Sequence, residues 1–441
     1  MEQRRKNLTQ LFIPICLETL LYMLSGMVDT LMLSSVNDQA VGAVGTANTY
    51  IGIFIIMFSV ISSGMVAVMT QNIGAERPGI AYQARQLGLA FNAALGVIMS
   101  LFLSLGAGTI LSGVGVADAL MQPAKTYLQI VGGFCILNAL IPICSSYLRA
   151  FGFSKEPLYA SIIGNVINFC LNAFFLFVLH KGVAGVATAT VISRIINLVI
   201  VVLLGAVLVK AKQHPERESN RAVMGQIIRI GLPSACETAI YNVSMTLVIR
   251  FLNQMDAQGL NVTARSYTMQ ITNFSYCVGA ALAQANAIMT GWHIGAKEYD
   301  ACDRGTKKAA VIGVIVAVIL ETVFTLCSGW IMQLFSKDPQ MVSLVGKLLA
   351  IDIVLEIGRV TNLVYGQALK TSGDAVFPVV MGACFMILCS VGGTYLFGIR
   401  LGLLAVGAYI GMTGDECVRA VGMYLRWKSG KWKEKGLVKS R

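Results

Sequence analysis

A carboxylate lies in the second half of the first apolar stretch of the chain, where the residues read Gly26-Met27-Val28-Asp29-Thr30. Placing an ionisable side chain at membrane depth is costly, and such side chains usually mark the path of an ion or a substrate. Asp29 could exchange a proton there, or hold Na⁺ together with neighbouring hydroxyl and carbonyl oxygens. We therefore predict that Asp29 couples an ion to the activity of the protein.

A second set of polar side chains shares one face of a predicted helix late in the chain. Asp352, Glu356 and Arg359 are spaced at i, i+4 and i+7, and Asn362 continues the same face. Glu356 and Arg359 form either a buried structural ion pair or a proton switch that is released when the pair breaks. We predict that Glu356 couples an ion and that Arg359 and Asn362 face a cavity.

Two glutamates occupy matching positions in the two halves of the chain. Glu18 and Glu237 each follow a proline by four residues, and each is followed by a threonine. These Glu-Thr pairs either hydrogen-bond across a helix bundle or serve in transport, and the sequence leaves both roles open. We predict Glu237 as an ion-coupling residue and Glu18 as a cavity residue. The other ionisable candidates in apolar segments are Arg194, Glu321, Glu416 and Arg419.

Three asparagines lie on one face of another predicted helix. Asn165, Asn168 and Asn172 are three and four residues apart. A stripe of buried amides either hydrogen-bonds to other helices or lines a wet cavity. Because Asp29 offers a polar partner, we predict that Asn168 and Asn172 line a cavity.

The elements that must position these side chains are transmembrane helices. The chain has 441 residues, of which 56% are hydrophobic and only 13% are charged, whereas soluble domains carry about 25% charged residues. A spanning segment needs about 20 apolar residues and must satisfy its own backbone hydrogen bonds, so apolar runs of this length predict helices. We predict twelve spans, at residues 8–33, 43–70, 84–112, 124–148, 158–179, 185–209, 226–251, 264–290, 307–332, 344–369, 376–398 and 403–426.

The sequence repeats itself at half its length. At an offset of 221 residues, three positions recur, Arg149, Gly152 and Pro157 returning as Lys370, Gly373 and Pro378. The pattern of residues 14–25 returns at 233–244, so we predict two six-helix bundles of the same orientation, as in many transporters. The predicted parts are an N-lobe at 1–209, a loose cytoplasmic linker at 210–225, a C-lobe at 226–426 and a basic tail at 427–441.

The net charge of +12 is distributed unevenly between the two sides of these predicted spans. Lys and Arg concentrate in alternate loops and at both ends of the chain. By the positive-inside rule, this distribution predicts that both termini are cytoplasmic. We predict that the protein lies in the inner membrane. The asymmetry accounts for the positive charge without nucleic acid. We predict that the basic tail lies along anionic lipid headgroups.

No motif in the sequence indicates an enzyme or a cofactor. There is no Gly-rich phosphate loop, no HExxH and no GxSxG. The 11 cysteines form no CxxC pair and fit small core residues better than metal ligands. We therefore predict a transporter without a cofactor or resident metal, driven by H⁺ or Na⁺.

Several motifs resemble, in order, those of the multidrug and toxic compound extrusion (MATE) family. The motifs are Pro14 with Val28-Asp29-Thr30, then Thr70-Gln71-Asn72-Ile73-Gly74-Ala75, Arg149-Ala150-Phe151-Gly152, Asn168-Phe169-Cys170-Leu171-Asn172 and the Gly-rich run 182–189. The resemblance covers essentially the whole chain and is closest to bacterial members.

The resemblance implies an all-α, V-shaped pair of six-helix lobes. Such proteins export amphipathic, often cationic, compounds in exchange for H⁺ or Na⁺. The acid of the first helix maps onto Asp29 and its fifth-helix partner maps onto Asn172, which implies a Na⁺ position near both. Gln71 comes with the second-helix motif as a cavity residue. C-lobe coupling acids map only approximately, onto Glu237 and Glu356. We expect a monomer that contacts small organic substrates and lipids.

Two other functions fit parts of the sequence. A flippase of a lipid-linked precursor would need a more cationic cavity than the few arginines in the spans provide. A membrane enzyme would need facing catalytic acids or a histidine–metal cluster, yet His180, His214 and His293 are predicted at helix ends or in loops. Multidrug export by alternating access is the function we predict.

Overall fold

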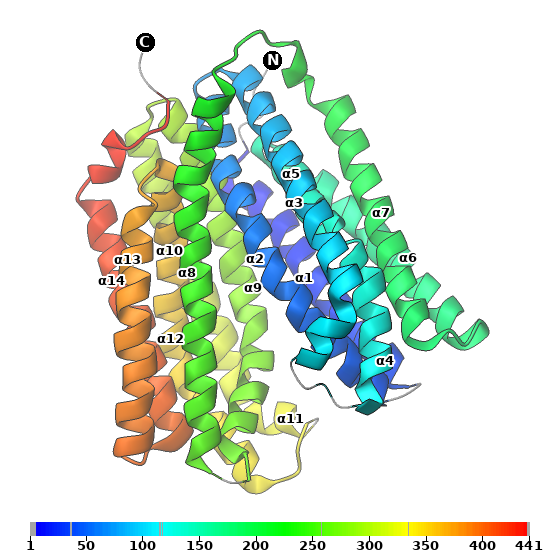
Figure 1. Ribbon diagram of the computed structural model, residues 1–441. Helices are drawn as coiled ribbons and strands as arrows, with labels where there is room; N and C mark the ends of the chain where they lie inside the picture. Colours follow the sequence, from blue (N-terminus) through cyan, green and yellow to red (C-terminus); the bar gives the residue numbers. More distant parts are fainter. Residues whose placement is uncertain are drawn as a thin grey trace. The chain divides into compact units, whose positions relative to one another are not determined.

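The structure is a computed structural model that describes residues 6–35, 38–113, 116, 118–256, 258–333 and 335–438. Within these ranges the chain is helical and contains no strand (Figure 1). It divides into two compact units, Met1–Leu232 and Pro233–Arg441, which are described separately below.

The N-terminal unit is a bundle of six spans. Its helices are α1 (Leu8–Ser34), α2 (Asp38–Gly74), α3 (Pro78–Gly113), α4 (Asp118–Tyr127), α5 (Ile136–Ala150), α6 (Lys155–Ala173) and α7 (Gly182–Leu208). A π-helical segment, Leu128–Gly132, joins α4 to α5, and the two arms of this span meet at 43°. A second π-helical segment, Phe174–Val178, extends α6.

The C-terminal unit repeats this arrangement. Its helices are α8 (Asn220–Met255, which begins in the first unit), α9 (Leu260–Gly295), α10 (Tyr299–Leu326), α11 (Ser328–Met332), α12 (Pro339–Ser372), α13 (Val376–Phe385) and α14 (Leu404–Lys428). Two π-helical segments, Met386–Val391 and Thr394–Arg400, continue α13. Helix α12 is the central element, because it packs against α9, α10 and α14 (Figure 1).

Each of the twelve predicted spans coincides with one helix or with consecutive helical segments, so the predicted fold class is confirmed. By length and composition, seven helices could cross a membrane alone, and the bent α4–α5 pair brings the number to eight. The spans that do not meet this test are α8, α9, α12 and α14. These four spans are less apolar than the others.

Local sequence explains where α12 begins and ends. The Asp338 carboxylate accepts a hydrogen bond from the Gln340 backbone amide at 3.0 Å, and Pro339 occupies the first turn. Both features favour a helix start because the first amides of a helix lack intrahelical partners. The helix stops at Gly373, whose φ of +99° is a left-handed conformation that favours glycine. Only a residue without Cβ fits, because an added Cβ would lie 2.2 Å from the Lys435 carbonyl oxygen.

The sequence suggested a loose connector between the units. In the structure, hydrogen bonds attach this connector to α3. The Gln83 side-chain amide donates to the Glu218 carbonyl oxygen at 2.7 Å and accepts from the Glu218 amide at 3.1 Å. The Arg217 guanidinium donates to the Gly79 carbonyl oxygen at 2.9 Å. Residues 214–219 are therefore tied to the end of the N-terminal unit.

The chain after α14 folds back onto the C-terminal unit, where the sequence suggested a tail lying on lipid headgroups. Trp432 is 1% exposed and stacks on Trp427 with ring centroids 4.1 Å apart. The Asp374 carboxylate accepts hydrogen bonds from Lys435 at 2.8 Å and from Arg426 at 2.7 Å. We call residues 427–438 with Asp374 the C-terminal clasp.

Candidate functional site

The N-terminal unit brings Asp29 of α1 beside the amide stripe of α6. The Asn172 amide donates to Asp29 Oδ1 at 2.7 Å and to Asn168 Oδ1 at 3.2 Å. Asn172 is fully buried, and its own Oδ1 has no hydrogen-bond partner among the described residues. The Arg194 guanidinium of α7 also acts electrostatically on Asp29. A carboxylate oxygen and an unpartnered amide oxygen could thus hold a proton or a small cation here.

Glu18 and Glu237 form the same ion pair in the two units. Arg149 donates to Glu18 Oε2 at 2.5 Å, and Lys370 Nζ lies 2.5 Å from Glu237 Oε2. The cations are repeat mates, as are the glutamates, so the duplication preserved the pair as a unit. A carboxylate that is compensated in this way joins helices within its own unit. We therefore interpret both glutamates as structural. The remaining predicted N-terminal residue, Gln71, is fully buried in α2.

A chain of alternating charges crosses the C-terminal unit from α12 to α14. Arg359 pairs with Glu356 one turn earlier on α12, and its Nε lies 3.5 Å from Glu416 Oε1. The Asn362 amide donates to Glu416 Oε2 at 3.0 Å. Arg419 Nη2 also lies 2.9 Å from Glu416 Oε1. Glu356, Arg359 and Asn362, which the sequence placed on one face, thus join one network.

The network ends at Asp415, a residue the sequence analysis did not single out. Arg419 Nε lies 2.8 Å from Asp415 Oδ1, and the Ser390 hydroxyl donates to Asp415 Oδ2 at 2.9 Å. The spacing of Asp415, Glu416 and Arg419 could have revealed this face, because four and three residues separate acid from base on one helix.

Close packing of α12 on α14 makes the network possible. A Cβ added to Gly358 would lie 2.8 Å from the Cys417 backbone nitrogen and 2.9 Å from the Glu416 carbonyl carbon. Small residues let helix backbones approach closely within membranes. Without a side chain at position 358, Glu416 comes within reach of Arg359.

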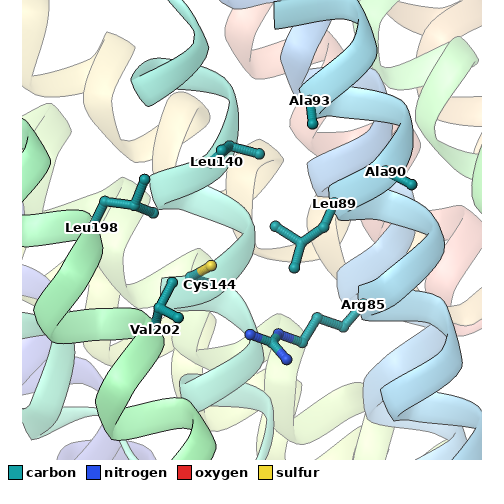
Figure 2. Close-up of a pocket in the computed structure, with 8 residues that line it drawn as sticks. All are labelled: Arg85, Leu89, Ala90, Ala93, Leu140, Cys144, Leu198 and Val202. Carbon is teal, nitrogen blue, oxygen red and sulfur yellow. The ribbon is translucent and has the colours of Figure 1, made fainter.

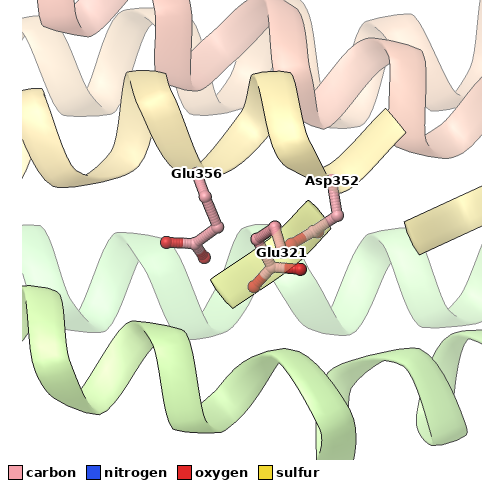
Figure 3. A group of neighbouring side chains, drawn as sticks. All are labelled: Glu321, Asp352 and Glu356. Carbon is pink, nitrogen blue, oxygen red and sulfur yellow. The ribbon is translucent and has the colours of Figure 1, made fainter. Parts of the chain in front are cut away.

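Three carboxyl groups gather where α12 faces α10. Figure 3 shows Asp352 and Glu356 projecting from one helix toward Glu321 of α10. One oxygen of each side chain lies within 4.8 Å of the others, and all three residues are buried. Both oxygens of Glu321 and one oxygen each of Asp352 and Glu356 have no hydrogen-bond partner among the described residues. We call Glu321, Asp352 and Glu356 the acid triad.

The acid triad cannot hold three full negative charges in this position. Like charges at such short distances repel strongly in a medium of low dielectric constant, and burial removes the water that would stabilise them. Arg359 compensates one charge through Glu356. The remaining charge requires protons or a bound cation, and the unpartnered oxygens are the ligand type that hard cations such as Na⁺ prefer.

A cavity of about 230 Å³ lies beside the acid triad, within the C-terminal unit. Its wall contains Asp352 together with Asp415, Glu416 and two arginines, Arg265 and Arg359. The remainder of the wall is aromatic, thioether or small and polar, formed by Tyr241, Met245, Met269, Thr272, Asn273, Tyr276, Leu355, Ser390, Tyr409 and Met412. The helices that supply these residues are α8, α9, α12, α14 and the π-helical segment after α13.

Helices α8, α9, α12 and α14 all line this cavity. Their polar side chains in its wall explain why these four spans are less apolar than the others. The buried carboxyl groups of the cavity and the acid triad outnumber the guanidinium groups of Arg265, Arg359 and Arg419 by five to three. Aromatic faces and thioethers suit flexible apolar ligands, and aromatic faces also attract cations. Such a cavity can hold an organic cation.

From the sequence, Glu321 and Asp352 were recognised as ionisable residues without an assigned role, and Arg265 was not a candidate. Arg265 is buried in α9, and its guanidinium contacts the Met245 sulfur at 3.7 Å. These assignments depend on which helices are neighbours. Spacing along a single helix does not contain that information.

Comparison with known proteins identifies a family model that matches the chain twice. The MatE model matches residues 14–174 and 233–396. The two matches begin at Pro14 and Pro233, the positions that the repeat superimposes. The predicted duplication is therefore confirmed.

Similar proteins extend over nearly the whole chain. The uncharacterised transporter YisQ of Bacillus subtilis (strain 168) is 34% identical over 431 residues, which cover 96% of this chain and 94% of YisQ. A probable multidrug resistance protein NorM of Thermotoga maritima is 23% identical over 457 residues, covering 98% of this chain and 94% of NorM. A crystal structure of MATE in the straight conformation superimposes with a TM-score of 0.85 at 19% identity, covering 97% of this chain and 96% of that one.

Proposed function

The chain belongs to the MatE family of multi-pass membrane transporters, and from this premise we propose that it exports small organic cations in exchange for H⁺ or Na⁺. Several relatives are described as probable multidrug resistance proteins. We propose the same broad class of cargo for this chain, an inner-membrane location and cytoplasmic termini. The transporters of this family are not enzymes and need no cofactor.

One observation carries the proposal: an aromatic and methionine-lined cavity adjoins the acid triad in the C-terminal unit. Asp352 belongs to both, so a ligand in the cavity and an ion at the triad share a carboxyl group. Binding of H⁺ or Na⁺ removes negative charge that attracts an organic cation. The two ligands therefore compete, as an exchanger requires.

The ionic network gives this competition a mechanical link. Glu356 belongs to the acid triad and pairs with Arg359, while Arg359 also contacts Glu416 in the cavity wall. Neutralising Glu356 weakens its hold on Arg359 and lets the guanidinium turn toward Glu416. Occupancy of the triad thus alters the charge that the cavity presents to cargo. In alternating access, the ion taken up outside would promote release of the organic cation.

The cavity chemistry argues against a flippase for a lipid-linked pyrophosphate. An anionic headgroup needs a surplus of cationic side chains, whereas carboxyl groups are in excess around this cavity. Asp29 with Asn172 remains a second proposed ion position, in the N-terminal unit. Separate mutation of Asp29 and of the acid triad will show which of the two positions couples the ion.

The test follows a pH gradient across everted vesicles with a fluorescent probe while Na⁺ or ethidium is added. Glu321→Gln and Asp352→Asn should abolish the ethidium-dependent collapse of the gradient if H⁺ is the coupling ion. If Na⁺ is the coupling ion, ethidium uptake driven by an imposed Na⁺ gradient should be lost instead. Glu434→Gln, which removes an exposed carboxylate of the same unit, should leave both signals unchanged.

Asp29→Asn is measured in parallel because it distinguishes the two ion positions. Full ethidium-dependent exchange in Glu321→Gln and Asp352→Asn, with loss only in Asp29→Asn, would overturn the role of the acid triad. Absence of any response of the wild-type chain to a panel of organic cations under both gradients would overturn the proposed cargo class.

A further inference from the structure

A groove unrelated to the carboxyl groups runs along the N-terminal unit. It has a volume of about 380 Å³ and lies among α3, α5 and α7. Helix α5 contacts both of the other helices and so forms the floor. Apart from Arg85, the side chains that line the groove are alanine, leucine, valine and one cysteine. Figure 2 shows Arg85 reaching from α3 across the groove toward α5 and α7.

The guanidinium of Arg85 lacks a counterion within the part of the chain that the structure describes. It stacks over the Tyr147 ring, 4.7 Å from the centroid. Its Nε is buried and has no hydrogen-bond partner among the described residues. Two neighbouring arginines differ, because Arg149 pairs with Glu18 and Arg77 lies 3.9 Å from Glu218. Arg85 is half-buried, and a half-buried cation without a counterion in an apolar groove can bind an anion from outside the chain.

The length of α3 places Arg85 at the depth of lipid headgroups when the helix is centred in the bilayer. The 36 residues of α3 span about 54 Å at the helical rise, which exceeds a hydrocarbon core of about 30 Å by roughly 12 Å at each end. Arg85 is seven residues from the first residue of α3, or about 10 Å. Cys144 and Val202 each precede the ends of their helices by six residues, so all three reach the same level.

Exposed apolar side chains flank the mouth of the groove. Val202 is exposed, as are Leu203 and Val207 farther along α7 and Phe91 on α3, and all are apolar. From Arg85 the groove continues deeper into the membrane along Leu140 and Leu198, which lie four residues farther from the helix ends than Cys144 and Val202. A cation at headgroup depth with an apolar furrow running inward matches the two halves of a phospholipid.

We propose that this groove is a binding site for an anionic phospholipid. The phosphate accepts hydrogen bonds from the Arg85 guanidinium, including the unpartnered Nε, and one acyl chain lies in the furrow over α5. The leaflet is the one on the side of the connector, because Gln83, two residues from Arg85, is bonded to that connector. Bound lipid would hold α3 and α7 together over α5.

The test is native mass spectrometry of the full chain, purified in detergent and equilibrated with equal amounts of phosphatidylglycerol and phosphatidylcholine. The wild-type chain should retain phosphatidylglycerol preferentially. Arg85→Gln should lower this preference about fivefold, the effect expected from one basic side chain at the headgroup surface. Arg85→Lys should keep most of it. Arg229→Gln is the matched control, since it removes an exposed arginine of α8 nine residues from the start of that helix.

A second variant tests the apolar part separately. Ala93→Phe fills the furrow without changing charge, so it should reduce retention of phosphatidylglycerol even if Arg85→Gln cannot be purified. Equal retention of the two lipids by the wild-type chain would overturn the proposal. So would an unchanged preference in both Arg85→Gln and Ala93→Phe, or displacement of the bound lipid by inorganic phosphate alone.

Discussion

Replacement of Trp432 by alanine should release the C-terminal clasp. Trp432 is 1% exposed, stacks on Trp427 with an interplanar angle of 8°, and donates from Nε1 to the Trp427 carbonyl oxygen at 2.9 Å. Its ring also meets Tyr299 edge-on at 5.9 Å. Truncation of a buried tryptophan to alanine costs about 3–5 kcal/mol. The loss falls on a short terminal segment, so it should favour local opening over global unfolding.

The assay is limited trypsin digestion of the purified chain in detergent, read by mass spectrometry at Lys431 and Lys433. When opening is fast, cleavage follows the population of the open segment, and 3 kcal/mol corresponds to an increase of about 100-fold. Trp330→Ala is the control because Trp330 is 71% exposed and should change neither site. Equal cleavage rates in Trp432→Ala and the wild-type chain would refute the inferred packing of the clasp.

Three further predictions concern the C-terminal unit. Burial raises the pKa of Asp374, but hydrogen bonds from its two cationic partners lower it more, so the folded pKa lies below the ordinary value near 3.8. The ionised Asp374 carboxylate should stabilise the clasp fully above the ordinary pKa near 3.8, and this stabilisation should be lost as pH falls through the folded pKa. Tryptophan fluorescence should show the clasp opening in that pH range. The signal of Asp374→Asn should depend less on pH. Gly373→Ala should destabilise the clasp far more than Gly430→Ala in thermal denaturation, because both glycines have positive φ but only the first would place Cβ against backbone. Arg359→Leu should cost about 3–5 kcal/mol by leaving Glu356 unpaired, and Glu356→Gln in the same chain should recover part of it; additive losses in a double-mutant cycle would contradict the pair.

The sequence predicted the fold well because the membrane constrains it so strongly. A helix is the simplest way for a single segment to satisfy its backbone in lipid, so long, mostly apolar runs predicted helices at all twelve spans, including the four more polar ones. The bend within the span of α4 and α5 was not predicted, although Pro123 and Pro142 lie in its two arms. The sequence also missed the clasp, since Trp432 and Lys435 gain their partners only after the chain turns back.

The sequence predicted those parts of the site that lie on one helix, but not the contacts between helices. Spacing placed Glu356 and Arg359 on one face, and the structure pairs them. Spacing could not bring Glu321 to the same place, because that contact requires α10 to pack against α12. Asp29 and Asn172 were linked through the family resemblance, and a hydrogen bond joins them. Their proposed roles in ion coupling stay predictions.

The duplication separates scaffold from function by what each copy has retained. Both units keep a glutamate paired with a cation at repeat-related positions, as expected of a contact that holds each bundle together. The ionisable side chains around the two candidate sites are not duplicated. The N-terminal unit contributes one carboxylate, Asp29, beside amides, whereas the C-terminal unit concentrates carboxyl groups around Arg359 and Arg419. The unmatched charges inside the membrane spans are therefore the ones to which we assign ion coupling.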